Sequence, residues 1–289
     1  MAKIEQLPMP PSAVQECALA ELDHVSRVVE SLAPKEWSRR SAVERWTVGD
    51  VVAHLDLFVG MYSRFLGNVL SGGGSSPMAK LIGWLTGSIL PETAPVFDTI
   101  NGAVPKVMNR LLAPDHIKRQ FAAGARNTRD RLLHVTADDC VRPVFFEGGP
   151  YPLWFYLAIV VNELAIHCWD IESAVAGVAE LSDGARGMLP WFYWTSTRLM
   201  FRPPMRTRGT VDIVLDEPRS ALWWSLADGS IDLGRGTTPH PDAVIRSLSG
   251  AYVLALAGRL SSAEALQRSM TVAGDRGLAE TFLASWHLI

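Results

Sequence analysis

Apolar positions recur at intervals of three and four along the first two thirds of the chain, which is the pattern of amphipathic helices. The five long stretches that carry this pattern are residues 12–32, 47–70, 116–135, 153–176 and 183–201. Thr47 is the predicted N-cap of the second helix, and Asp50 occupies the capping-box position three residues later. The repeat of long helices predicts a helical bundle.

The fourth of these helices, 153–176, is apolar on nearly every side, which predicts a buried position. It nevertheless carries Glu163, His167 and Asp170. At 3.6 residues per turn, Glu163 and His167 project within roughly 40° of each other, and Asp170 follows one turn later. Buried carboxylates require a partner, and a metal ion is one of the few that satisfies several at once.

The pattern changes after Pro203-Pro204, where helix breakers end the fifth helix. Short, partly alternating runs predict strands, and Glu217-Pro218 and Asp228-Gly229 predict the turns between the first three. The predicted strands are 210–215, 221–226, 230–233, 242–246 and 270–273, and the predicted helices are 248–260 and 278–286. The fold class is therefore α+β, with a helical domain over 1–205 and a small α+β domain over 206–289.

Residues 71–115 interrupt the bundle pattern. The segment begins with Gly72-Gly73-Gly74, a flexible break, and continues with short predicted helices over 78–90 and 104–112. Its apolar content is high for a loop. An insertion packed on the bundle is the favoured interpretation, and a lid over a pocket is the alternative.

Composition excludes several classes of protein. The 289 residues include 27 Lys and Arg and 30 Asp and Glu. The resulting net charge of −3 does not indicate a nucleic-acid-binding protein. The three cysteines lack CxxC spacing and indicate neither a disulfide framework nor a thiolate zinc site, which fits a reducing cytoplasm. No run approaches the roughly 20 apolar residues of a membrane span.

His54 lies on the apolar face of the second predicted helix, where a histidine is more often a core residue than a ligand. Together with Glu163 and His167, however, it completes a set of three nitrogen and oxygen ligands. Such a set suits a divalent transition metal and leaves coordination positions open, as in catalytic sites. A Glu–His pair joined by a hydrogen bond in a polar corner is the alternative. Cys168 projects about 100° away from His167 and is interpreted as a core residue.

Two motifs resemble the mycothiol-dependent maleylpyruvate isomerase family, within the DinB-like group of metal-binding four-helix bundles. They are Trp-Thr-Val-Gly-Asp-Val-Val-Ala-His-Leu over 46–55 and Glu-Leu-Ala-Ile-His-Cys-Trp-Asp-Ile over 163–171. The resemblance implies that His54, Glu163 and His167 are zinc ligands and that mycothiol is the thiol co-substrate. It also implies that Asp170 supports the cofactor site by orienting a ligand.

The run over 249–259 is similar to the helix whose arginine assists substrate binding in that isomerase, which makes Arg259 a catalytic candidate. A guanidinium suits this role because it binds a carboxylate through two hydrogen bonds. An exposed arginine at a helix end is the alternative. The resemblance further implies a sterol carrier protein-like C-terminal domain. Asn162 departs from the family, since relatives often have an arginine before the Glu.

The first functional hypothesis is a metal-dependent enzyme that uses mycothiol as a nucleophile on an electrophilic small molecule, either as an isomerase or as a thiol S-transferase. The second is a non-catalytic protein that binds a lipid or another hydrophobic molecule. A third is a regulatory partner protein with a vestigial site. The sequence does not identify the substrate.

Overall fold

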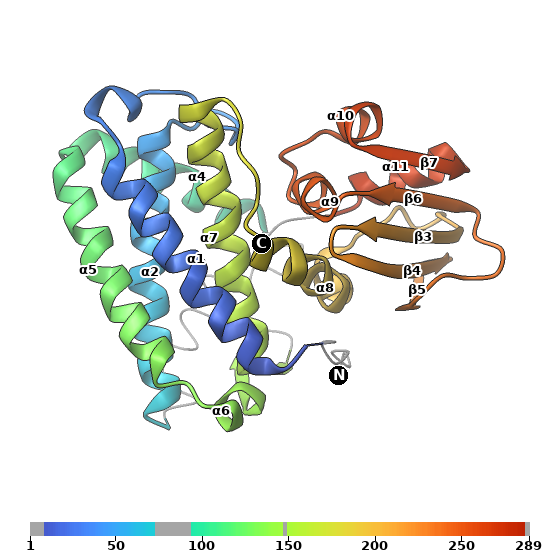
Figure 1. Cartoon of the computed structure of the whole chain (residues 1–289), viewed down its shortest axis with the longest axis horizontal. Coiled ribbons are helices and arrows are strands. Elements are labelled where there is room, and N and C mark those ends of the chain that lie inside the picture. Colours follow the sequence, from blue (N-terminus) through green and yellow to red (C-terminus); the bar gives the residue numbers. More distant parts are fainter. Residues whose placement is uncertain (1–8, 73–93, 147–148, 287–289) are drawn as a thin grey trace. The chain divides into compact units, whose positions relative to one another are not determined.

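The structure is a computed structural model, and it describes residues 9–72, 94–146 and 149–286 (Figure 1). A helical N-terminal part is followed by a C-terminal part that contains a five-stranded sheet, so the predicted α+β class is confirmed. The described chain divides into two compact units, one up to Ser182 and one from Asp183 onward. Each unit has its own buried core.

Four long helices form the N-terminal unit: α1 (Pro11–Ser31), α2 (Val48–Leu70), α5 (Pro114–Leu133) and α7 (Leu153–Ala176). Helix α1 packs against α5 and α7, and α2 packs against the same two helices. The first four predicted helices are thus confirmed to within a few residues. Smaller elements complete the unit: η1 (Pro34–Glu36), α4 (Ala94–Leu111), α6 (Ala137–Val141) and the hairpin of β1 (Pro143–Phe146) and β2 (Gly149–Pro152).

Helix α7 is largely buried within this bundle. Most of its side chains are buried, as its uniformly apolar sequence predicts. Within the described residues it is the one helix long and apolar enough to cross a membrane, yet 83% of its most apolar window is buried inside the protein. The helix ends at Gly177, whose φ of 79° is the left-handed conformation that favours glycine at a helix C-terminus.

Helix α4 differs from its prediction. Pro105 suggests a break that would start a short helix near Val104, but the observed helix begins at Ala94 and contains Pro105 in its interior. A proline disfavours the helix interior because it removes one backbone donor, but it does not forbid that position. The helix packs on α2. The other helix expected in the 71–115 insertion, over 78–90, lies outside the described residues.

The C-terminal unit contains α8 (Asp183–Met200) and a sheet with the strand order β5-β4-β3-β6-β7. The strands are β3 (Gly209–Asp216), β4 (Arg219–Ala227), β5 (Ser230–Arg235), β6 (Ala243–Ser247) and β7 (Met270–Gly274), joined antiparallel except for the parallel pair β3–β6. The remaining helices are α9 (Ser249–Leu256), α10 (Ser262–Arg268) and α11 (Arg276–Ala284). All five predicted strands are present, whereas α10 was not predicted.

The grouping of α8 with the C-terminal unit differs from the predicted boundary near residue 205. Helix α8 packs against α9, and Trp224 of β4 donates a hydrogen bond of 2.9 Å from Nε1 to Thr197 Oγ1. The Tyr193 ring also contacts Trp286, with 5.6 Å between the ring centroids. A proline pair shows where a helix ends but not which core its apolar face joins.

Candidate metal centre

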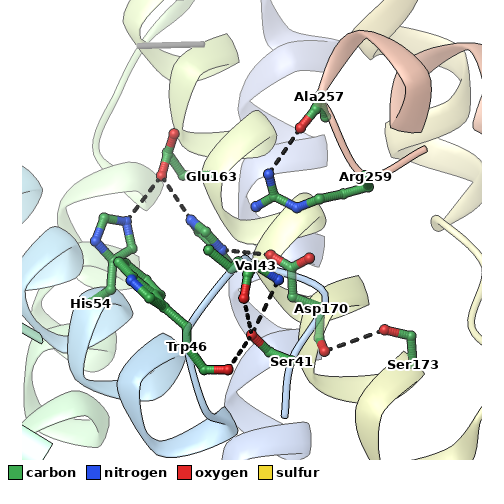
Figure 2. Close-up of polar contacts among 10 residues, drawn as sticks. Ser41, Val43, Trp46, His54, Glu163, Asp170, Ser173, Ala257 and Arg259 are labelled. Carbon is green, nitrogen blue, oxygen red and sulfur yellow. Dashed lines mark hydrogen bonds and ion pairs between the residues drawn. The ribbon is translucent and has the colours of Figure 1, made fainter. Parts of the chain in front are cut away.

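Helices α2 and α7 each contribute to one cluster of ligand-type side chains. Glu163 and His167 lie four residues apart on the same face of α7, and His54 comes from α2, which packs against α7. His54 Nε2 lies 3.3 Å from Glu163 Oε2, and His167 Nε2 lies 3.5 Å from the same oxygen. The three possible ligand atoms all lie within 4.8 Å of one another. Figure 2 shows His54 and Glu163 directed toward each other.

The three side chains are largely buried but not fully enclosed. Relative exposures are 14% for His54, 16% for Glu163 and 11% for His167. A small part of each side chain is therefore open to solvent. The low exposure also strengthens electrostatic interactions, because less water screens the charges.

Asp170 holds the ring of His167 from the other side. Its carboxylate is fully buried, and Oδ2 lies 2.8 Å from His167 Nδ1. A proton on Nδ1 that is donated to Asp170 leaves Nε2, the nitrogen facing Glu163, free to act as a ligand. Asp170 therefore occupies a position from which it orients a ligand rather than joining the ligand set.

The side chains of this cluster shift one another's pKa values. Burial opposes ionisation of Glu163, but hydrogen bonds and charge interactions with His167 and His54 outweigh it and hold the pKa of Glu163 well below its usual range. For His167, burial lowers the pKa, and the hydrogen bonds and charges of Asp170 and Glu163 more than reverse that effect, so the pKa is raised. The site therefore favours an ionised Glu163 and a protonated His167.

Trp46 forms one wall of this cluster, a role that the helix pattern did not reveal. Its ring is nearly parallel to that of His167, with an interplanar angle of 13° and 6.3 Å between centroids, and its centroid lies 5.4 Å from that of His54. The preceding loop is closed by the Ser41 hydroxyl, which donates to the carbonyl oxygens of Trp46 and Val43 and accepts from the Val43 backbone N–H (Figure 2). The available signal was position, since Trp46 directly precedes the N-cap of the helix that carries His54.

Arg259 is placed in the C-terminal unit, in the turn that follows α9. The predicted helix over 248–260 ends earlier, at Leu256, and Gly258 adopts a φ of 66° in the turn. Arg259 Nη1 donates a hydrogen bond of 2.9 Å to the carbonyl oxygen of Ala257 (Figure 2). The structure thus brings His54, Glu163, His167 and Asp170 together within the N-terminal unit, while Arg259 belongs to the other unit.

Cys168 also differs in part from its interpretation as an apolar core residue. It is buried and projects away from the His54 cluster, as expected, but its thiol faces the polar side chains His24 and Glu172. Sequence periodicity does not show this contact because the two helices that form it are separated by more than a hundred residues.

The donor set of the His54 cluster fits a divalent transition metal. Two imidazole nitrogens and one carboxylate oxygen, without a thiolate, form the kind of three-ligand set found in catalytic zinc sites. The ionised Glu163 can act as a ligand directly, whereas His167, whose pKa is raised, must give up its Nε2 proton when a metal binds.

Comparisons with known proteins identify the family of the chain and similar folds. Residues 18–172 match the family described as mycothiol maleylpyruvate isomerase N-terminal domain. The structure is similar to a crystal structure of the mycothiol-dependent maleylpyruvate isomerase, with a TM-score of 0.56 and 17% identity over 92% of this chain and 93% of that one. A histidine-to-alanine mutant of that enzyme gives a TM-score of 0.55 at the same identity and coverage. None of the curated proteins compared matches the chain.

Proposed function

The chain belongs to the mycothiol maleylpyruvate isomerase family, and we propose that it is a metal-dependent enzyme that uses mycothiol to transform an electrophilic small molecule. The observation that carries the proposal is the convergence of His54, Glu163 and His167 from α2 and α7. These are the residues that the family resemblance implies as ligands, and they meet at a partly exposed position.

We propose zinc as the metal, held by His54, Glu163 and His167. When bound, a divalent zinc ion lowers the pKa of a coordinated thiol and so supplies a nucleophile at neutral pH. The chain itself contributes the geometry. Asp170 fixes the ring of His167, Glu163 supplies the negative charge that favours a cation, and Trp46 covers the two imidazole rings.

The substrate of this family reaction carries carboxylate groups, and we propose Arg259 as the residue that binds one of them. A guanidinium offers two parallel donors to a carboxylate. The hydrogen bond from Arg259 to Ala257 engages Nη1 and supports the side chain at the end of α9. We further propose that the C-terminal unit is a sterol carrier protein-like domain. A thiol co-substrate must stay reduced, so the proposal places the enzyme in the cytoplasm.

An isomerase and an S-transferase would use this site differently. In both, the thiol sulfur forms a bond to an electrophilic carbon. An isomerase breaks that bond after rotation about the former double bond and releases the thiol unchanged, whereas a transferase leaves a thioether in the product. The family supports the isomerase outcome, which we propose as the first activity to test.

The test uses the zinc-loaded full chain with mycothiol and maleylpyruvate, and the products are followed by chromatography and mass spectrometry. We expect a rearranged acid and unchanged mycothiol. The His54→Ala variant should lose both the activity and one equivalent of metal. His134→Ala is the matched control, because His134 is exposed at the end of α5 and outside the cluster.

Two results would contradict the proposal. One is the absence of both a rearranged acid and a thioether across maleylpyruvate and a panel of other electrophiles. The other is a His54→Ala variant with unchanged metal content. The second hypothesis from the sequence, a non-catalytic protein that binds a lipid, is not favoured by the family match.

A further inference from the structure

A second cluster of ligand-type side chains lies between α1 and α7. His24 lies on α1. Cys168 and Glu172 lie four residues apart on one face of α7, which packs against α1. His24 Nε2 lies 3.1 Å from Glu172 Oε1, and one ligand atom from each of the three residues lies within 4.8 Å of the other two. The two helices pack along each other in the bundle (Figure 1).

Negative charge accumulates around this cluster. Glu21, three residues before His24 on α1, is 2% exposed and accepts a hydrogen bond from Ser182. Burial, and to a smaller extent the carboxylate of Glu172, raise the pKa of Glu21. A buried carboxylate close to a second carboxylate is unfavourable unless a cation is near both.

The side chain of His24 acts on both carboxylates, because it lies 3.1 Å from Glu172 and its charge lowers the pKa of Glu21. The thiol of Cys168 is buried, and its sulfur lies within 4.8 Å of a ligand atom of Glu172. A bound divalent cation would offset negative charge from Glu21, Glu172 and a Cys168 thiolate together.

We propose that His24, Cys168 and Glu172 form a second metal site, which binds a divalent transition metal such as zinc and is separate from the His54 site. Imidazole and thiolate ligands favour zinc over magnesium or calcium, which prefer oxygen ligands. On binding, the Cys168 sulfur forms the bond to the metal, and its proton passes to the solvent.

The geometry permits this site after small adjustments. Donor atoms of a tetrahedral zinc ion lie about 3.5 Å apart, given bond lengths near 2.0–2.3 Å. The observed limit of 4.8 Å is wider, but the side chains of His24 and Glu172 are 31% and 29% exposed and have room to move. Their exposure also provides an entry path to the buried thiol. A metal at this position would join α1 to α7 and stabilise the bundle.

Cobalt(II) provides a probe that distinguishes the two sites, because a cobalt–thiolate bond gives a charge-transfer absorption in the near ultraviolet. The His54 site contains no thiol and cannot give this band. The metal-free full chain is titrated with cobalt(II) without oxygen. We expect two bound equivalents and the thiolate band in the wild type. Cys168→Ser should lose the band and one equivalent.

Two variants serve as controls. Cys140→Ser removes another buried thiol, from α6, and should retain both equivalents and the band. His54→Ala should lose one equivalent but keep the band, so the second site is tested independently of the proposed catalytic function. If Cys168→Ser does not fold, His24→Ala replaces it as the test. Loss of this partly exposed ligand should lower the affinity for the cobalt ion that gives the band by about tenfold or more. Even the loss of a residue that only supports a metal ligand costs that much.

The proposal fails if the wild type binds cobalt without a thiolate band. It also fails if the band persists unchanged in Cys168→Ser, or if His24→Ala leaves the affinity of the band-forming equivalent unaltered. An inactive protein that shows the band would contradict the proposed enzyme function and leave the second site supported.

Discussion

The ring orientation of His167 depends on one buried carboxylate. Asp170 is fully buried and contacts Nδ1, so the opposite nitrogen faces Glu163 and His54. The spacing of these residues on α7 predicts this arrangement, because residues three and four apart share a helix face. What spacing does not predict is the degree of burial, which makes Asp170 a stronger partner for His167 than an exposed carboxylate would be.

Asp170→Asn should therefore lower the affinity of the His54 site for zinc by about 10- to 100-fold, as observed for partners of metal-binding histidines. The neutral amide is a weaker acceptor for Nδ1 and less able to fix the ring. Competition with a chelator of known affinity measures the change. Ser173→Ala is the control, since Ser173 contacts the backbone oxygen of Asp170 and not its carboxylate. An unchanged zinc affinity in Asp170→Asn would show that the ring is held by packing alone.

At the scale of helices and strands, local sequence signals predict the bounds of an element where interactions between nearby residues determine them. The capping box at Thr47 and Asp50 is present as predicted, and it fixes the start of the helix that carries His54. The wall formed by Trp46 and the polar cluster around Cys168 could not be predicted in this way. The stacking of Trp46 on His167 and the cluster around Cys168 join segments far apart in the chain, and periodicity within one helix contains no information about them.

Two capping boxes of the same Thr-x-x-Asp type differ in burial and should differ in their contribution to stability. Asp50 is 6% exposed and also accepts a hydrogen bond of 2.9 Å from Asn109, whereas Asp139 caps α6 near the surface. Asp50→Ala should cost about 2–3 kcal/mol, because it leaves buried donors without an acceptor. Asp139→Ala should cost about 0.5–1 kcal/mol, as for ordinary caps. Urea unfolding measures both values, and equal costs would contradict the role assigned to burial.

The capping box of Thr136 and Asp139 should also make the free energy of unfolding depend on pH. Hydrogen bonds from the backbone and then the side chain of Thr136 lower the pKa of Asp139 below its ordinary value of 3.8. A lowered folded-state pKa contributes stability that is present above the ordinary value and lost as the pH falls below it. Asp139→Asn should therefore destabilise the protein at pH 7, and the difference from wild type should shrink at pH 3. Urea unfolding at the two pH values measures this, and a constant difference would indicate a cause other than ionisation.

At the scale of the whole molecule, each of the two compact units has a buried core of its own, as a folded domain requires. The N-terminal unit buries α7 among its other helices and holds all three ligands of the His54 site. In the C-terminal unit, α8 contributes Tyr193 and Thr197 to a core that includes Trp224 and Trp286. The sequence predicts both units by the change from helical to strand periodicity. It does not assign α8, because a helix pattern shows that one face is apolar but not which core buries that face.

Expression of two fragments tests the position of the boundary. A fragment of residues 1–182 should fold and bind zinc at the His54 site, because its core and ligands are complete. A fragment of residues 1–205 adds α8 without the core that buries its apolar face, and this exposed patch should cause aggregation. Size-exclusion chromatography and zinc content compare the two. A monomeric 1–205 fragment together with an unstable 1–182 fragment would place α8 with the bundle, as the proline pair at 203–204 suggests.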